Sequence, residues 1–333
     1  MASVLISALE LDTEKREPDL DPQPDNPLGF FESQQLVSLN DCLLAEIGCN
    51  WNRPPLLMPR WGRAPHLETL IKARSSLRRY AMTSKWIDKD PRLCLTLPAY
   101  VHILLKRVPV VAVLRNPFAV ATSLYWRDGI PIDAGLAFWF LHNHHLAAAL
   151  EAEDLIVTYD ALTCMSKSDT RASLPEQLSL FLADRGLEVA GPHVIEAALQ
   201  QRLNAGLNRA GTALRPRMGS ASSHVELLTL CQRAYCSVVE HVDAKVMRFC
   251  EVFDALPRAV LNTLQLFDML PTPQVINSPD PADQARLREL AHQLACSAHS
   301  LQASEKELSD LRASISWRLT SPLRALRQGW RRH

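Results

Sequence analysis

Residues 108–123 read VPVVAVLRNPFAVATS, and this stretch decides the fold class of the chain. Residues 108–114 are apolar and rich in β-branched side chains, which is typical of a strand buried on both faces of a parallel sheet. Asn116 then supplies a helix N-cap, and Pro117 suits the first helical turn. The stretch predicts a buried strand that passes directly into a helix, as in doubly wound α/β proteins.

The same alternation of strands and helices continues on both sides of this stretch. A short strand is predicted around residues 86–87 and another at 155–159, where the sequence reads LIVTY. A long apolar helix is predicted over 134–151, and residues 174–270 follow a nearly continuous helical pattern. Ser33 is a candidate N-cap for an earlier helix, whose apolar stripe consists of Leu36, Leu39, Leu43, Leu44 and Ile47. Together these units predict an α/β fold, a parallel sheet flanked by helices.

Composition excludes several classes of protein. The 333 residues carry 36 Lys and Arg against 36 Asp and Glu, so the chain lacks the basic excess of a general nucleic-acid binder. Its 8 cysteines show no C-x-x-C spacing and are too sparse for a disulfide scaffold, which indicates a reducing compartment. Residues 1–11 lack the basic segment of a secretory signal, and no apolar run is long enough to span a membrane. We therefore expect a cytoplasmic protein.

Prolines at 271, 273, 279 and 281 mark a linker, residues 271–282, after a domain of residues 1–270 that ends in a helical part. Leu or Ile recurs with a heptad period from Leu287 to Ile315, which predicts a coiled coil over 283–315, suited to self-association or to a partner. Residues 316–333 contain no acid and combine arginines with Trp317 and Trp330. This basic amphipathic tail either contacts the inner face of a membrane, docks on a partner or keeps the coiled coil soluble.

Ligands of open parallel sheets bind beside the carboxyl ends of the strands, so the residues that follow 108–114 are the first candidates for a site. Arg115 leaves the predicted strand beside a helix N-terminus, and Ser123 lies about two turns along that helix. A guanidinium fork with a nearby hydroxyl suits a phosphate monoester. The alternative is an arginine paired with a carboxylate and a serine that faces solvent. These residues alone leave both interpretations open.

The chain resembles the sulfotransferases that use 3′-phosphoadenosine-5′-phosphosulfate (PAPS). Five blocks carry the resemblance in order: DNPLGFFES at 25–33, LN at 39–40, WIDKDPRL at 86–93, VLRNP at 113–117 with Ser123, and VTYDAL at 157–162. The resemblance covers roughly residues 4–210. It implies a P-loop-like α/β fold in which Arg115 and Ser123 hold the 3′-phosphate of PAPS. It also implies a transferase without a metal cofactor that sulfonates a hydroxyl acceptor on a carbohydrate or glycan.

The resemblance assigns further roles near the same sheet edge. Lys89 would stabilise the charge that develops on the bridging oxygen, and Arg92 either binds the cofactor or pairs with Asp90. Glu32 follows two aromatic residues, which can desolvate its carboxylate and strengthen it as the base for the acceptor hydroxyl. Its alternative role is that of a helix N-terminal acid that complements the dipole. Arg209 lies where related enzymes place a loop over the cofactor, and its alternative is a solvated arginine.

One element of the family has no counterpart in the sequence. The 5′-phosphosulfate loop, a turn of the type Gly-x-x-Arg-Ser-Gly-Thr-Ser after the first strand, matches no residues here, so the expected fold lacks that strand and that loop. Backbone N–H groups of such loops hold the anionic end of the cofactor. Two interpretations remain: a truncated copy of an active enzyme, or an inactive relative that acts as a scaffold through its coiled coil and tail. A P-loop kinase is disfavoured because no G-x-x-x-x-G-K-[ST] motif is present.

Overall fold

The computed structural model of the chain describes residues 1–11, 31–61, 69–70, 72–73, 77, 86–163, 173–187, 191–202, 222–240 and 245–269. The chain divides into two units, Met1–Gln274 and Val275–His333, and every described residue lies in the first. The predicted linker at 271–282, the coiled coil at 283–315, the tail at 316–333 and Arg209 all lie outside the described residues.

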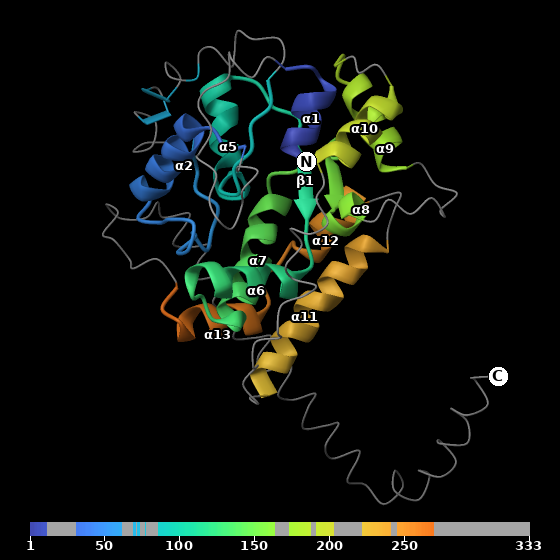
Figure 1. Ribbon diagram of the computed structural model, residues 1–333. Coiled ribbons are helices and arrows are strands. Elements are labelled where there is room, and N and C mark those ends of the chain that lie inside the picture. Colours follow the sequence, from blue (N-terminus) through green and yellow to red (C-terminus); the bar gives the residue numbers. More distant parts are fainter. Residues whose placement is uncertain are drawn as a thin grey trace, which may run out of the picture. The chain divides into compact units, whose positions relative to one another are not determined.

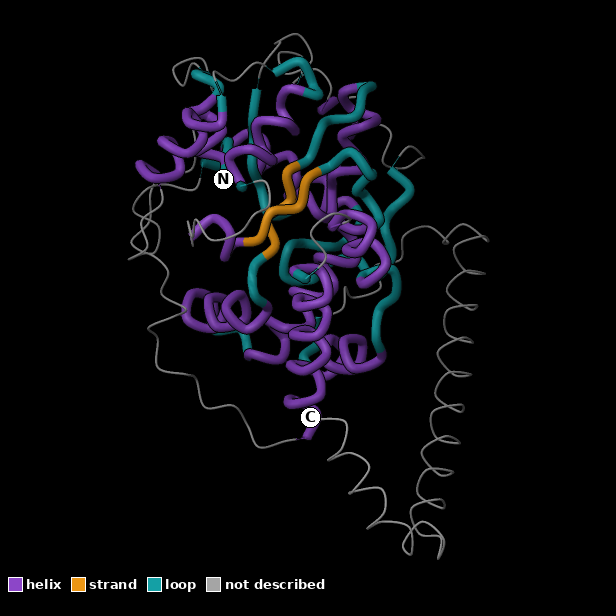
Figure 2. The backbone as a smooth tube through the Cα atoms, turned by 90° about the vertical axis from the view of Figure 1, so that its right-hand side faces the viewer, coloured by secondary structure: helices purple, strands orange, loops and turns teal. Residues whose placement is uncertain are grey.

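Two parallel strands form the sheet of the described residues and run side by side in Figure 2. β1 (Val111–Leu114) pairs with β2 (Leu155–Thr158), with Val111 opposite Leu155 and Leu114 opposite Thr158. Both strands lie where the sequence predicts them, which confirms a mixed α/β fold, although most of the described elements are helices. β1 begins after Pro109, because a proline has no N–H to donate to a ladder.

The strand predicted around residues 86–87 is wrong. Residues 86–90 belong to neither a helix nor a strand, although Ile87, like Val111 and Tyr159, packs against one of the buried hydrophobic clusters. The short apolar run is followed by Asp88 and Asp90, whose carboxylates accept hydrogen bonds from backbone N–H groups. In this segment side-chain carboxylates accept the hydrogen bonds of backbone N–H groups that the carbonyl groups of a neighbouring strand would otherwise accept.

Helices surround the two strands in the arrangement of Figure 1. Before β1 come α1 (Ala2–Ala8), α2 (Gln34–Glu46) and α5 (Leu93–Leu104); between the strands come α6 (Pro117–Asp128) and α7 (Ile132–Ala147); after β2 come α8 (Tyr159–Thr163), α9 (Leu174–Ala183), α10 (Pro192–Arg202), α11 (Ser222–Val239), α12 (Lys245–Val252) and α13 (Arg258–Leu266). The path through α6 and α7 is the helical crossover that two parallel strands require. Among the described helices, none has both the length and the apolar character needed to cross a membrane.

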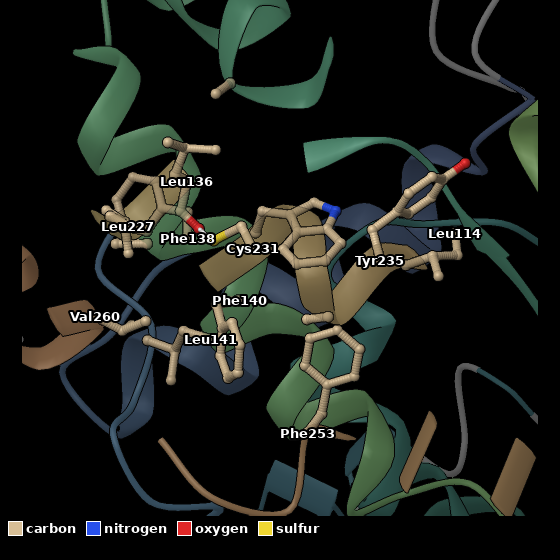
Figure 3. Packing of buried hydrophobic residues seen from close by; sticks show 14 of the residues in the cluster. Leu114, Leu136, Phe138, Phe140, Leu141, Leu227, Cys231, Tyr235, Phe253 and Val260 are labelled. Atoms are coloured by element: carbon tan, nitrogen blue, oxygen red, sulfur yellow. Dashed lines mark hydrogen bonds between the residues drawn. The ribbon is translucent and has the colours of Figure 1, made fainter. Parts of the chain in front are cut away.

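Each face of the sheet is covered by its own hydrophobic cluster. Ala112, Leu114 and Ile156 belong to the cluster formed with α6, α7, α11, α12 and α13, part of which is drawn in Figure 3. Val157 belongs to the second cluster, formed with α1, α9 and α10, and Val111 packs against it. This division follows from the alternation of side chains along each strand. A third cluster lies between α2 and α5, and Trp86, in the segment that contains Lys89, packs against it.

Candidate functional site

The carboxyl ends of β1 and β2 bring Arg115 and Tyr159 together, since each residue directly follows its strand. The Arg115 guanidinium lies over the Tyr159 ring, with 4.6 Å between Cζ and the ring centroid. This is the distance of a cation–π contact. The Arg115 carbonyl oxygen accepts a hydrogen bond of 2.9 Å from Nε1 of Trp139 on α7. The structure thus places Arg115 at the sheet edge, half-buried and held through both its side chain and its backbone.

Asn116 starts α6 as the sequence predicts. Its side-chain oxygen accepts hydrogen bonds from the N–H groups of Phe118 (3.0 Å) and Ala119 (3.3 Å), which is N-capping. Its Nδ2 donates to Oε1 of Gln232 on α11, at 3.3 Å. Ser123 lies farther along α6 and is exposed. The described structure therefore places the helix N-terminus beside Arg115 and presents the Ser123 hydroxyl to solvent.

A second hydrogen bond attaches α11 to the same edge of the sheet. The Tyr235 hydroxyl donates to Oδ2 of Asp160 at 2.6 Å, and Asp160 directly follows Tyr159. Burial, together with the neighbouring Asp160 carboxylate, raises the pKa of Tyr235, so the phenol keeps its proton and remains a donor. Figure 3 shows Tyr235 within the main hydrophobic cluster, close to Leu114 at the end of β1.

The two residues predicted to be catalytic form an ion pair. Nζ of Lys89 donates a hydrogen bond to Oε1 of Glu32, although the residues are 57 positions apart in the chain. The Glu32 side chain is 7% exposed and the Lys89 side chain 43% exposed, so a buried carboxylate meets a cation that still reaches solvent. The sequence assigned these residues from separate blocks, and the described structure brings them into contact.

The ion pair lies at the N-terminus of α2. Ser33, which follows Glu32, is the N-cap of this helix, and its hydroxyl accepts a hydrogen bond from Leu36 N–H at 3.3 Å. This confirms the cap that the sequence predicts. The N–H of Ser33 donates to Oδ1 of Asp88 at 3.4 Å, and the N–H of Lys89 donates to the same oxygen at 2.8 Å. Asp88 therefore connects the start of α2 to the segment that carries Lys89.

Arg92 is engaged in ion pairs with two aspartates. Its Nη1 lies 3.0 Å from Oδ1 of Asp90, and its Nε lies 2.7 Å from Oδ1 of Asp41. The Asp90 side chain is fully buried, and its second oxygen accepts a hydrogen bond of 2.8 Å from Nδ2 of Asn40. The sequence left two roles open for Arg92, cofactor binding or pairing with Asp90. The described structure shows the pairing with Asp90.

Asn40 has a structural role that the sequence interpretation did not assign. It is fully buried on α2, where its Oδ1 accepts hydrogen bonds from the hydroxyls of Thr96 (2.7 Å) and Tyr100 (2.8 Å). A signal was available, because Asn40 lies between Leu36 and Leu43 on the apolar stripe of the predicted helix. A polar residue on such a stripe needs buried hydrogen-bond partners.

At the amino ends of the strands a different charged cluster is found. Asp154 has a fully buried side chain that accepts hydrogen bonds from Arg107 and from the N–H of Val110. Arg107 also pairs with Glu151, at 2.7 Å. Beside them lies a cavity of about 270 Å³ between α5 and the end of α7. Because the Arg107 guanidinium is already bound to two carboxylates, this cavity is a poorer anion site than the carboxyl ends of the strands.

The histidines of α7 are bound to backbone groups. Nε2 of His145 interacts with the carbonyl oxygen of Pro55, and Nδ1 of His142 lies 2.9 Å from the carbonyl oxygen of Phe138. Burial lowers the pKa of both residues, so both are neutral near neutral pH. Within the described residues no group of three or more His, Cys, Asp or Glu side chains is arranged to hold a metal ion.

No family model, no curated protein and no solved structure matches the chain. The chemistry is therefore inferred from the side chains themselves. A carboxylate can accept a proton from a hydroxyl, an ammonium can stabilise a developing anionic oxygen, and a guanidinium at a helix N-terminus can bind a phosphate. Glu32, Lys89 and Arg115 offer these three functions.

Proposed function

We propose that the chain binds PAPS and transfers its sulfonate to a hydroxyl group of a carbohydrate or glycan. The observation that carries this proposal is the ion pair between Glu32 and Lys89. The fold brings a carboxylate and an ammonium from separate blocks of sequence into contact, so that both are available to one reacting centre. The parallel strands with Arg115 at their carboxyl end support a P-loop-like sheet as the finer description of the fold.

In the proposed reaction the acceptor oxygen forms a bond to the sulfur as the bond between the sulfur and the bridging phosphate oxygen breaks. Glu32 takes the proton of the acceptor hydroxyl. The leaving phosphate oxygen keeps the electron pair of the broken bond, and Lys89 stabilises its negative charge. The products are a sulfate ester and 3′,5′-ADP. Lys89 contacts Glu32 in the described structure, so the proposed cation lies beside the proposed base.

Arg115 and Ser123 are the proposed anchor of the 3′-phosphate. The planar guanidinium of Arg115 is held over Tyr159, so little side-chain freedom remains to be lost when a phosphate binds. The exposed hydroxyl of Ser123 on α6, the helix that follows Arg115, is a suitable second donor. We leave Arg92 out of this anchor, because its guanidinium already donates to Asp90 and Asp41. A role for Arg209 in cofactor binding remains a prediction from the resemblance.

The proposal is tested by calorimetric titration of the full chain with 3′,5′-ADP, followed by transfer assays with ³⁵S-labelled PAPS and a panel of carbohydrate acceptors. We expect saturable binding of 3′,5′-ADP and labelled product from at least one acceptor. Binding without transfer to any acceptor would favour the alternative, an inactive relative that acts as a binding protein. If the parent protein shows no binding of 3′,5′-ADP, the assignment to this cofactor fails.

A further inference from the structure

We propose that Asn40 is a positioning residue that holds Lys89 against Glu32. The effect of Asn40 on catalysis rests on the proposed function, whereas its contacts are observed independently of that function. Lys89 lies between two aspartates, and each of them is hydrogen-bonded to α2. Glu32 directly precedes the N-cap of that same helix. The helix α2, together with the two residues that precede it, therefore carries the carboxylate and both attachment points of the segment that carries the ammonium.

The first attachment point is Asp88. One of its oxygens accepts hydrogen bonds from the N–H groups of Ser33 and Lys89, at 3.4 and 2.8 Å. Ser33 is completely buried and is itself the N-cap of α2. The backbone of Lys89 is thereby connected through a single carboxylate to the residue that follows Glu32.

The second attachment point is Asp90, which follows Lys89. Its Oδ2 accepts the hydrogen bond from Nδ2 of Asn40, and its Oδ1 accepts hydrogen bonds from the backbone N–H and the guanidinium of Arg92. Asp90 is 5% exposed and Asn40 is completely buried, so solvent does not compete strongly for these groups. The carboxylate is satisfied on both oxygens and has a defined orientation.

Asn40 is itself oriented by α5. Its Oδ1 accepts the hydroxyl hydrogen bonds of Thr96 and Tyr100. With the oxygen taken by two donors, the amide nitrogen is directed to Asp90. Ser33 and Asn40 lie about two helical turns apart, so the two attachment points are on one face of α2. Lys89 is thus held between two points of a rigid element rather than at the end of a free loop.

We call Asp88, Asp90 and Asn40 the clamp of Lys89. The clamp matters for catalysis because a small displacement of a reacting group lowers the reaction rate. A misplacement of about 1 Å lowers a rate by roughly a hundredfold. Asn40 touches neither the acceptor nor PAPS in the proposed reaction, and it acts only through Asp90 and Lys89. Loss of the Asn40 contact is therefore expected to lower kcat while the KM for PAPS stays close to that of the parent.

The test uses Asn40→Asp in the full chain. This variant keeps oxygen acceptors for Thr96 and Tyr100, but it replaces the amide donor to Asp90 with a second carboxylate, and the two like charges repel one another. The matched variant Asp90→Asn weakens the same contact without an added charge, because one amide oxygen must then serve both Asn40 and Arg92. The control is Asp154→Asn, which alters a buried aspartate at the opposite ends of the strands.

Two measurements are made on each folded variant. The first is the rate at which a limiting amine-acylating reagent labels Lys89, followed by mass spectrometry. It requires no enzymatic activity. We expect labelling of Lys89 to rise several-fold in Asn40→Asp and Asp90→Asn and to stay unchanged in Asp154→Asn. The second is the transfer rate, for which we expect a kcat lower by about a hundredfold in Asn40→Asp.

Unchanged labelling of Lys89 in either folded clamp variant overturns the clamp, whatever the activity. Increased labelling with an unchanged kcat in an active protein overturns the positioning role. If the parent transfers no sulfonate but the variants show increased labelling of Lys89, the clamp is supported and the proposed function fails. The failure of the clamp and the failure of the proposed function are therefore distinguishable. If Asn40→Asp does not fold, the labelling of Lys89 in Asp90→Asn decides whether the contact between Asn40 and Asp90 holds Lys89.

Discussion

The guanidinium of Arg115 lies over the ring of Tyr159, and 4.6 Å separate Cζ from the ring centroid. The two residues directly follow Leu114 and Thr158, which are opposite one another in the sheet. The contact therefore closes the carboxyl end of the strand pair and directs a cation to the edge where ligands of parallel sheets bind. It also fixes the guanidinium before any ligand arrives, which reduces the entropy lost on binding.

Replacement of Arg115 by lysine is expected to weaken the binding of 3′,5′-ADP while the fold is retained. A lysine keeps the positive charge but loses the planar fork, so the loss should be about 1.5–3 kcal/mol of binding free energy. Calorimetric titration measures it directly. Arg127→Lys is the control, because Arg127 is exposed on α6, the helix that follows Arg115, and pairs with Asp128. Equal affinities of the parent and Arg115→Lys would remove Arg115 from the site.

The Glu32–Lys89 pair is expected to contribute to stability as well as to transfer. Lys89→Met leaves a buried carboxylate without its cation, and because Lys89 is 43% exposed, solvent partly offsets the loss. We expect a decrease in the free energy of unfolding of roughly 1–3 kcal/mol for Lys89→Met, measured by urea denaturation.

The double variant with Glu32→Gln should lose less stability than the sum of the single variants, since the pair is removed only once. In transfer assays, both single variants should lose most of their kcat. A coupling free energy indistinguishable from zero would show that the ion pair contributes nothing to the folded state.

Arg115 and Arg92 show which features of the site can be predicted from the sequence and which cannot. The position of Arg115 was predictable, because an apolar β-branched run followed by an Asn–Pro helix start fixes where the strand ends and the helix begins. The partners of Arg92 were not predictable, since Asp41 is 51 residues away and the contact depends on how α2 packs on α5. The same holds for Asn40, whose partners are 50 to 60 residues away. Local patterns determine elements, whereas buried polar networks depend on tertiary packing.

The close packing of α6 on α7 depends on Gly135. A Cβ atom at this position would lie 2.9 Å from Cα of Ala121 and 3.0 Å from its Cβ. Gly135→Ala is therefore expected to destabilise the protein by about 1–3 kcal/mol, although alanine favours a helix more than glycine does. Ala121→Gly in the same chain removes the side-chain part of the clash and should restore some of the loss. A Gly135→Ala protein more stable than the parent in urea would contradict this packing.

His145 is expected to make the fold sensitive to acid. Burial, above all other causes, lowers its pKa from 6.5 to about 3, and its Nδ1 has no hydrogen-bond partner among the described residues. As the pH falls through 6.5, His145 is therefore protonated in the unfolded chain but stays neutral in the folded chain. The contribution of His145 to stability is complete above pH 6.5 and is lost as the pH falls toward 3. At about pH 5 the loss should be roughly 2 kcal/mol.

The variant His145→Gln isolates this effect from the other titrating groups. A glutamine amide can still donate a hydrogen bond to the carbonyl oxygen of Pro55, but it does not titrate. His142 and His144 lie close to His145 and remain in both proteins, so their contributions cancel in the comparison. Urea unfolding at neutral pH and near pH 5 should show a larger loss of stability for the parent than for His145→Gln. If the two proteins lose the same free energy of unfolding, the proton is taken up elsewhere, and the His145 ring is not the acid-sensitive contact between α7 and the loop that carries Pro55.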